Sequence, residues 1–189
     1  MKKKQLLMTV LLIVLVIILV FSQRYFRENF KQVALLDNNI SSLKEYSMKN
    51  GGYLYSIPDN WTVSEKEGNS YKLYQSEFNN KEKNIMGYVE LLNTEEDIKS
   101  IAQRDIDNFS LKHSNEKIEN YSCKNYRGIK LEFISRVEDG YSFLNSNYYL
   151  RLDSNHVGKF SFTIKKSTYK DNINAIYDVI VSSIGVPRK

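Results

Sequence analysis

The pattern of hydrophobic and polar positions along this chain starts with one long apolar segment near the N-terminus. Between Leu6 and Phe21 there is no charged residue, no glycine and no proline, and Thr9 carries the single hydroxyl. A helix over residues 6–22 would be roughly 25 Å long at about 1.5 Å per residue, slightly short of a typical hydrocarbon core. It can span a bilayer if flanking side chains reach the interface. The pattern predicts a transmembrane anchor whose lipid contacts include Leu6, Leu12, Val16 and Phe21.

The expected orientation of this anchor follows from the lysines at positions 2–4. By the positive-inside rule they stay in the cytoplasm, which places the C-terminal part outside it. A cleaved signal peptide has a similar start, but its apolar stretch is usually shorter, and the site before Gln23 is a poor match. A lipoprotein signal is excluded because the sole cysteine, Cys123, lies far downstream. We expect a retained single-pass anchor in the cell membrane.

Residues 25–50 follow the tail and anchor of residues 1–24 with apolar side chains at helical spacing. Hydrophobic residues recur every three or four positions from Phe26 to Leu43, with charges between them. This stripe predicts a helical stalk that self-associates through residues 26–43 or lies on the membrane surface. A helix packed on the following domain and a frayed linker fit equally well, because Asp37-Asn38-Asn39 are poor helix formers. The domain itself is expected over residues 51–189.

Beyond residue 51, short extended segments are separated by two amphipathic helices. Aromatic and β-branched residues alternate with polar ones in the extended segments, which favours antiparallel strands with one buried face. Strands interrupted by helices predict an α+β fold, an antiparallel sheet flanked by helices. The expected strands are 53–57, 61–64, 71–74, 87–91, 129–134, 148–152 and 159–164, and the expected helices cover about 94–109 and 169–184.

Composition and charge narrow the class of protein. Residues 1–24 hold four basic and no acidic side chains, so the formal charge of +5 leaves +1 for the remainder. This near-neutral part argues against nucleic acid as a partner, because nucleic acid requires a concentrated basic patch. A single cysteine excludes an internal disulfide. The abundance of Lys, Asn, Ile and Tyr, with little Ala, Gly and Pro, is typical of an AT-rich bacterial genome.

Candidate catalytic and metal-binding residues are few. His113, His156 and Cys123 are the only imidazoles and thiol, and their spacing matches no zinc site. Asp153 and His156 lie close in sequence with Ser154, as in a hydrolase, but a nucleophile elbow is missing, and a hairpin turn explains this segment better. His113 and Cys123 are interpreted as structural. We therefore expect no enzyme activity, no cofactor and no metal.

Aromatic side chains are the remaining signal of a binding surface. Most of the fourteen Tyr and nine Phe residues are expected to fill a sheet and its cover. Adjacent tyrosines at positions 148 and 149 must point to opposite faces of a strand, so one of them could reach a surface. The best candidates for an exposed partner or ligand surface are Tyr141, Phe143, Tyr148 and Tyr149.

A family resemblance rests on the segment Tyr55-Ser56-Ile57-Pro58-Asp59-Asn60-Trp61. This Tyr-x-Ile-Pro-x-x-Trp opening resembles the start of the PsbP-like and DcrB-like extracytoplasmic domains, although many relatives have Gly where this chain has Asn60. The segment beginning Tyr126-Arg127-Gly128 and the helix after Phe160-Ser161-Phe162 are similar as well. The resemblance covers about residues 51–186. It implies an α-β-α sandwich and an accessory role without enzymatic activity, and it transfers no ligand.

Three functions follow as hypotheses. The first is a membrane-anchored extracytoplasmic domain that binds another protein of the bacterial cell envelope or assists its assembly. The second is a binding module for a wall polymer or small ligand, and a hydrolase is third.

Overall fold

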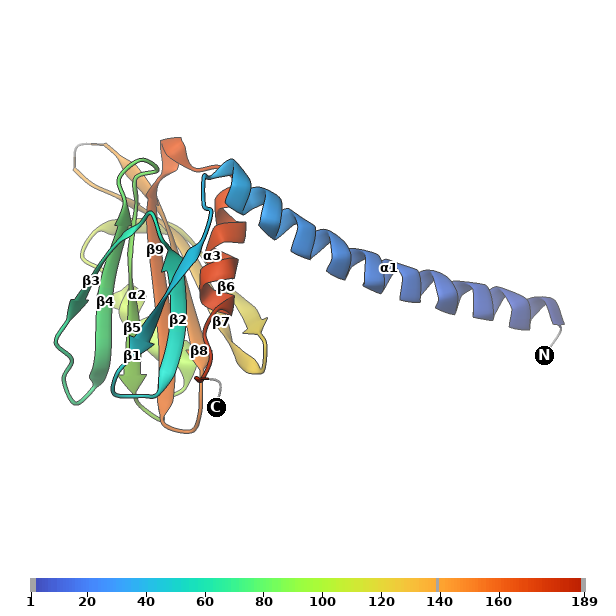
Figure 1. Cartoon of the computed structure of the whole chain (residues 1–189), viewed down its shortest axis with the longest axis horizontal. Helices are drawn as coiled ribbons and strands as arrows, with labels where there is room; N and C mark the ends of the chain where they lie inside the picture. The colour runs from blue at the N-terminus through green and yellow to red at the C-terminus, as the bar shows by residue number, and fades with distance from the viewer. Residues whose placement is uncertain (1–2, 139, 188–189) are drawn as a thin grey trace. The chain divides into compact units, whose positions relative to one another are not determined.

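The computed structural model describes residues 3–138 and 140–187, except for the side chains at positions 3–4, 6–7, 20–21 and 23–31. The chain divides into two units, Met1–Asn39 and Ile40–Lys189. The first unit contains one helix, and the second contains the sheets and the other helices (Figure 1). The elements are α1 (Lys3–Asp37), β1 (Leu43–Met48), β2 (Tyr53–Pro58), β3 (Thr62–Lys66), β4 (Lys72–Asn80), β5 (Ile85–Asn93), α2 (Ile98–Asp107), β6 (Lys112–Cys123), β7 (Tyr126–Arg136), β8 (Ser142–Arg151), β9 (His156–Lys165), a 3₁₀ turn (Lys166–Thr168) and α3 (Asn172–Ser182).

Helix α1 includes the segment expected as an anchor and runs on without interruption into the expected stalk. Met8 and every residue from Val10 to Leu19 are exposed in this unit, and all of these side chains are apolar. Leu12 and Val16 are among them, whereas Lys2 and the side chains of Leu6 and Phe21 lie outside the described residues. Within the described part of the chain, no helix combines the length and apolar character needed to cross a membrane.

The expected boundary at residue 50 was wrong. The helix ends at Asp37, and Asn39 adopts a left-handed backbone with φ 54°, so the helical spacing does not extend to Leu43. Residues 43–48 instead form β1, which pairs antiparallel with β2, Leu43 opposite Pro58. The poor helix formers before residue 40 end the helix, and pairing with a later segment gives the next residues their conformation. The domain therefore begins at Ile40.

The main sheet has seven strands in the order β3-β4-β5-β9-β8-β7-β6. Every neighbouring pair is antiparallel. β5 and β9 are neighbours in space although α2 and three strands separate them in sequence. Because β9 lies at the centre, the two strand groups β3–β5 and β6–β8 meet along it.

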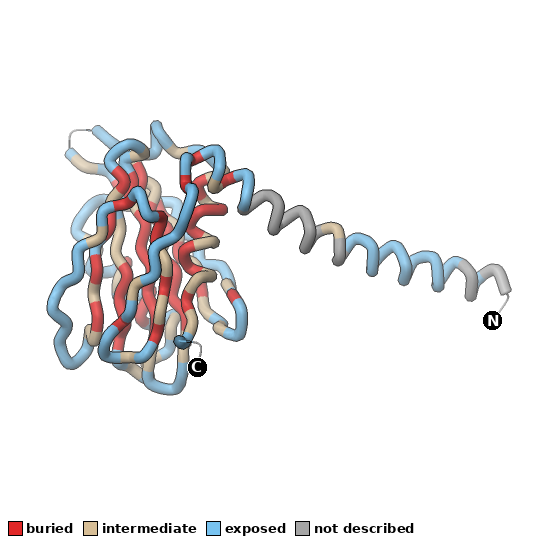
Figure 2. The backbone as a smooth tube through the Cα atoms, in the orientation of Figure 1, coloured by how far each residue is buried: buried red, intermediate tan, exposed pale blue. Residues whose placement is uncertain are grey.

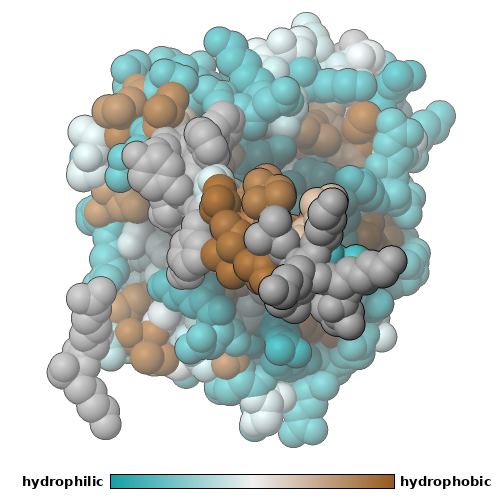
Figure 3. Space-filling view, turned by 90° about the vertical axis from the view of Figure 1, so that its right-hand side faces the viewer, coloured by the Kyte–Doolittle hydropathy of each residue, from teal (hydrophilic) through white to brown (hydrophobic). Residues whose placement is uncertain are grey.

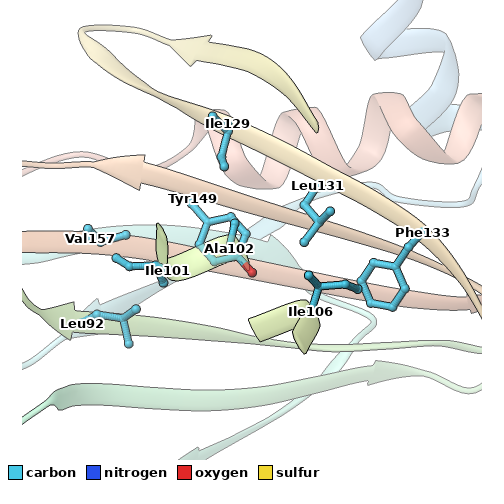
Figure 4. Close-up of a cluster of buried hydrophobic side chains, with 9 residues drawn as sticks. All are labelled: Leu92, Ile101, Ala102, Ile106, Ile129, Leu131, Phe133, Tyr149 and Val157. Carbon is cyan, nitrogen blue, oxygen red and sulfur yellow. The ribbon is translucent and has the colours of Figure 1, made fainter. Parts of the chain in front are cut away.

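Helix α2 covers part of one face of this sheet. Asp97 caps its start by accepting from the backbone N–H groups of Lys99 and Ser100. Its apolar side chains pack on β5, β7, β8 and β9 in one cluster (Figure 4). The buried members of this cluster are Leu92, Ile101, Ala102, Ile106, Ile129, Leu131, Phe133, Tyr149 and Val157. This confirms the amphipathic helix predicted between the strand groups.

The opposite face is covered by α3 and by the separate β1–β2 sheet. Tyr177 of α3 stacks on Phe162 of β9 with ring centroids 4.0 Å apart. Tyr55 of β2 meets Phe160 edge-on at 6.2 Å. Phe160 and Phe162 share one face because strand side chains alternate. The predicted α+β class, an antiparallel sheet flanked by helices, is confirmed.

Burial is highest in the central strands, as the red segments of Figure 2 show. On the face shown in Figure 3, hydrophobic side chains form separate patches among predominantly hydrophilic ones.

Trp61 belongs to the interior, since it is 4% exposed and its ring lies 5.5 Å from that of Phe78 in β4. Its backbone N–H donates to the carbonyl of Pro58, which closes the turn between β2 and β3. The turn therefore directs the indole into the core.

Candidate functional site

A groove of about 860 Å³ occupies the part of the sheet face that α2 leaves uncovered. Its floor comes from β3, β4, β5, β9 and β8, so residues far apart in sequence meet there. This volume lies within the range of about 300–1,000 Å³ that ligand sites occupy. Floor residues include Thr62, Asn79, Met86, Tyr88, Phe143 and Thr163.

Strand register places polar side chains in a row across this floor. Thr62 lies opposite Asn79, Asn79 opposite Met86, and Met86 opposite Thr163. The Thr163 hydroxyl donates to Asn145 Oδ1 at 2.9 Å, which extends the polar row into β8. The Oδ1 atom of Asn79 is buried and has no hydrogen-bond partner among the described residues. The floor is thus rich in amide and hydroxyl groups.

Aromatic side chains stand beside these polar groups. Tyr141 is 51% exposed, and Tyr88 and Phe143 are partly buried. The Lys165 ammonium lies 3.7 Å from the centre of the Tyr141 ring, a cation–π contact. The Tyr141 carbonyl accepts from the backbone N–H of Val137 at 3.0 Å, which holds this turn in place. The groove therefore combines planar apolar surface with hydrogen-bonding groups.

Of the four residues expected at a partner surface, Tyr141 and Phe143 line the groove. The prediction was wrong for Tyr148 and Tyr149, which are fully buried. They do point to opposite faces, but both faces of β8 are covered at this point. Tyr148 packs 4.8 Å from Tyr121, and the Tyr149 hydroxyl donates to Asp105 of α2 at 2.8 Å.

An ionic cluster, formed by Lys159, Asp105, Glu90 and Lys72, lies on the same sheet face, and Lys159 and Glu90 are its buried members. Lys159 Nζ lies 2.6 Å from Asp105 Oδ2 and 3.6 Å from Glu90 Oε2. Lys72 pairs with the other oxygen of Glu90 at 2.5 Å. The Lys159 ammonium also lies 5.0 Å from the ring centre of Tyr88, a residue of the groove floor. The cluster thus joins α2 to the floor of the groove.

The groups around Lys159 favour the charged form of its ammonium. Its side chain is 8% exposed and that of Glu90 is 3% exposed. Burial by itself would lower the pKa of Lys159, but Tyr88, Tyr149 and the two carboxylates raise the pKa overall. Sequence analysis missed this cluster. The sequence did contain a signal for it: a charged residue stands among apolar residues in each of two strands, Glu90 in β5 and Lys159 in β9.

The Asp153 to His156 segment is the turn between β8 and β9, as predicted. Asp153 accepts from the backbone N–H groups of Asn155 and His156 and from the Tyr53 hydroxyl at 2.5 Å. Its other close partner is His156 Nδ1 at 2.7 Å. Burial raises the pKa of Asp153, but hydrogen bonds from Tyr53 and His156 lower it to about 2. These contacts fasten the turn to β2.

The other candidate residues lie apart from the groove. His113 packs between Phe109 and Phe133, with ring centroids 6.0 Å from each. Cys123 is buried at the end of β6. Among the residues that the structure describes, no group of three or more His, Cys, Asp or Glu side chains could hold a metal ion.

Comparison with known proteins identifies the fold. No protein-family model matches the sequence, and no curated protein matches it significantly. The solution structure of cyanobacterial PsbP (CyanoP) from Synechocystis sp. PCC 6803 covers 78% of this chain and 94% of its own, with 17% identity and a TM-score of 0.56. LpqN of Mycobacterium tuberculosis, involved in cell envelope biogenesis, covers 77% of this chain and 91% of its own, with 11% identity and a TM-score of 0.48. PA94 of Pseudomonas aeruginosa, of unknown function, covers 79% of this chain and 99% of its own, with 12% identity and a TM-score of 0.44. The domain has the PsbP-like fold.

Proposed function

We propose that this chain is a non-enzymatic, membrane-anchored protein whose extracytoplasmic domain, Ile40–Lys189, binds a component of the bacterial cell envelope. The groove on the uncovered part of the sheet carries this proposal. It is open, and its lining offers aromatic rings and hydrogen-bonding groups rather than a nucleophile with its base. Binding an envelope component at the membrane surface is an accessory role, as the sequence resemblance implies.

The apolar side chains of α1 support the membrane anchor. Val10 to Leu19 are consecutive and exposed, and at about 3.6 residues per turn they occupy all sides of the helix. A helix that is hydrophobic all round is stable where lipid or protein surrounds it. The lysines at its start favour a cytoplasmic N-terminus.

Topology is tested by a reporter fused after Lys189 in bacterial cells. The anchor predicts activity of an exported alkaline phosphatase and inactivity of a reporter that needs the cytoplasm. N-terminal sequencing of the membrane-bound protein should return Met1 or Lys2. A protein that starts at Gln23 would show a cleaved signal peptide instead.

Binding through the groove is tested by photo-crosslinking in intact cells. A photoreactive amino acid replaces Met86, which is 53% exposed and lines the groove. A matched control carries the same group at Leu43 of β1, which is 38% exposed and outside the groove lining. The proposal predicts an adduct with a protein or a wall polymer from position 86 and none from position 43. Equal labelling from both positions would refute a specific groove.

A further inference from the structure

The floor of the groove presents hydrogen-bonding side chains from neighbouring strands. Besides the row of Thr62, Asn79 and Thr163, the lining includes Ser64 of β3 and Asn84 beside β5. Ser64 lies opposite Glu77, and Glu77 lies opposite Tyr88, so the next row across the sheet is polar at its β3 end as well. A ligand that covers these groups must offer its own donors and acceptors, because a buried polar group without a partner costs about 1–3 kcal/mol.

The aromatic rings of the groove restrict the ligand further. Tyr141 is half exposed above the floor, and Tyr88 and Phe143 line the same groove. A flat molecule with one apolar face can lie against such rings while its edges reach the amides and hydroxyls. The pyranose ring has this character, with C–H groups on its faces and hydroxyls at its rim.

The charges of the lining favour a neutral ligand. The lining carries charges of both signs: Glu77, which is paired with Lys66 across β3 and β4, and the cations Lys81 and Lys165, of which Lys165 lies on the Tyr141 ring. The lining therefore presents no concentrated field of one sign, such as a polyphosphate chain would require.

A peptide or an apolar helix fits this floor less well. The backbone groups of β4, β5 and β9 are engaged in the sheet ladder, so a peptide could add to the sheet only at the outer edge of β3 and could not lie across the floor as a further strand. An apolar helix face would bury Thr62, Asn79 and Thr163 under groups that cannot bond them.

We propose that the groove binds a neutral glycan chain, with a sugar ring against Tyr141 and hydroxyl or acetamido groups bonded to the floor around Asn79. This assignment rests on the proposed binding function and names its ligand class. Because the groove is open, a chain can continue past it, as a wall glycan strand would. The site differs from a sugar-cleaving site in that it requires no pair of facing carboxylates.

The test uses the full-length chain in detergent micelles and chitohexaose, a neutral chain of N-acetylglucosamine, as the probe. Isothermal titration calorimetry should show saturable binding. Tyr141→Ala should weaken it about tenfold, the loss expected for an exposed aromatic anchor. Asn79→Leu should weaken binding without lowering the thermal midpoint, because its Oδ1 has no partner to lose. The matched control is Tyr71→Ala, since Tyr71 is 37% exposed and contacts Arg104 but does not line the groove.

Each outcome has a definite meaning. Saturable binding that both groove variants weaken and Tyr71→Ala leaves unchanged supports a glycan site. Absence of chitohexaose binding, together with a protein adduct from position 86 in cells, overturns the glycan assignment and leaves the proposed binding function intact. Absence of both overturns the two together. Binding that Tyr141→Ala and Asn79→Leu leave unchanged shows that the sugar binds elsewhere and also overturns the assignment.

Discussion

Trp61→Ala tests the packing of the domain at its most specific point. The substitution removes the only indole ring of the chain, which is 4% exposed and packs against Phe78. Truncation of a buried Trp or Phe to Ala costs about 3–5 kcal/mol, because the site collapses only in part. A domain of this kind is stabilised by about 5–15 kcal/mol in total, so the loss is a large fraction. The single cysteine forms no disulfide that could offset it.

The expected cost of Trp61→Phe is much smaller. The Trp61 Nε1 atom is buried and has no hydrogen-bond partner among the described residues. Phenylalanine keeps most of the apolar contact with Phe78 and removes this unsatisfied donor. We expect a loss below about 1.5 kcal/mol.

Circular dichroism of the full-length chain during thermal unfolding measures both variants. Tryptophan fluorescence is unsuitable because each substitution removes the sole tryptophan. At about 2–4 °C per kcal/mol for a chain of this size, the midpoint of Trp61→Ala should fall by roughly 6–20 °C. Tyr71→Ala, at an exposed aromatic position, serves as the control and should shift little. An unchanged midpoint for Trp61→Ala would refute the packing described here.

Three further predictions concern the sheet, the ionic cluster and the turn. Gly128→Ala should destabilise the domain by about 3 kcal/mol in urea titrations, because an added Cβ would lie 1.8 Å from the Tyr149 carbonyl oxygen. Gly185→Ala is the control and should be tolerated, because its added Cβ would lie 3.5 Å from the nearest atom, Lys124 Nζ. Lys159→Met should cost about 3 kcal/mol by leaving Asp105 and the buried Glu90 without this cation, and adding Asp105→Leu should recover only part of that loss, because Glu90 stays buried and the Tyr149 hydroxyl loses its acceptor. The lowered pKa of Asp153 contributes stability that is complete above the unfolded pKa of about 3.9 and is lost as pH falls through about 2. Tyr53→Phe should flatten this acid dependence, and an unaltered profile would contradict the role of the Tyr53 hydroxyl.

Elements with strong local periodicity were predictable from the sequence. The apolar residues around Ile101 and Ile106 were sufficient to predict α2, although the helix begins after its Asp97 cap and not at about residue 94. The spacing of Ile173, Ile176 and Ile180 predicted α3 in the same way. In both helices one face is buried, so the 3.6-residue repeat is present in the sequence itself.

Two strands were not predicted, and both lie at edges. β6 is exposed along most of its length, so no alternation of apolar and polar residues marks it. It is a strand because β7 pairs with it, Tyr121 opposite Gly128. β1 is similar, since helical spacing continued into Leu43 and only pairing with β2 gives it an extended conformation.

The candidate site depended even more on the tertiary structure. From the sequence, Tyr141 and Phe143 could be named as surface aromatics, but so were Tyr148 and Tyr149, which α2 and the opposite layer bury. No local pattern indicates that α2 leaves part of its sheet face uncovered.

The sequence by itself determined the apolar N-terminal helix, the α+β class and the strands on either side of Pro58-Asp59-Asn60, because each depends on residues close together in the chain. Only the tertiary structure decided the groove and the ionic cluster. Thr62, Asn79, Met86 and Thr163 become neighbours through strand register, and Lys159 meets Asp105 through the docking of α2. Contacts of this kind arise from the packing of whole elements, and side-chain spacing along the chain does not encode them.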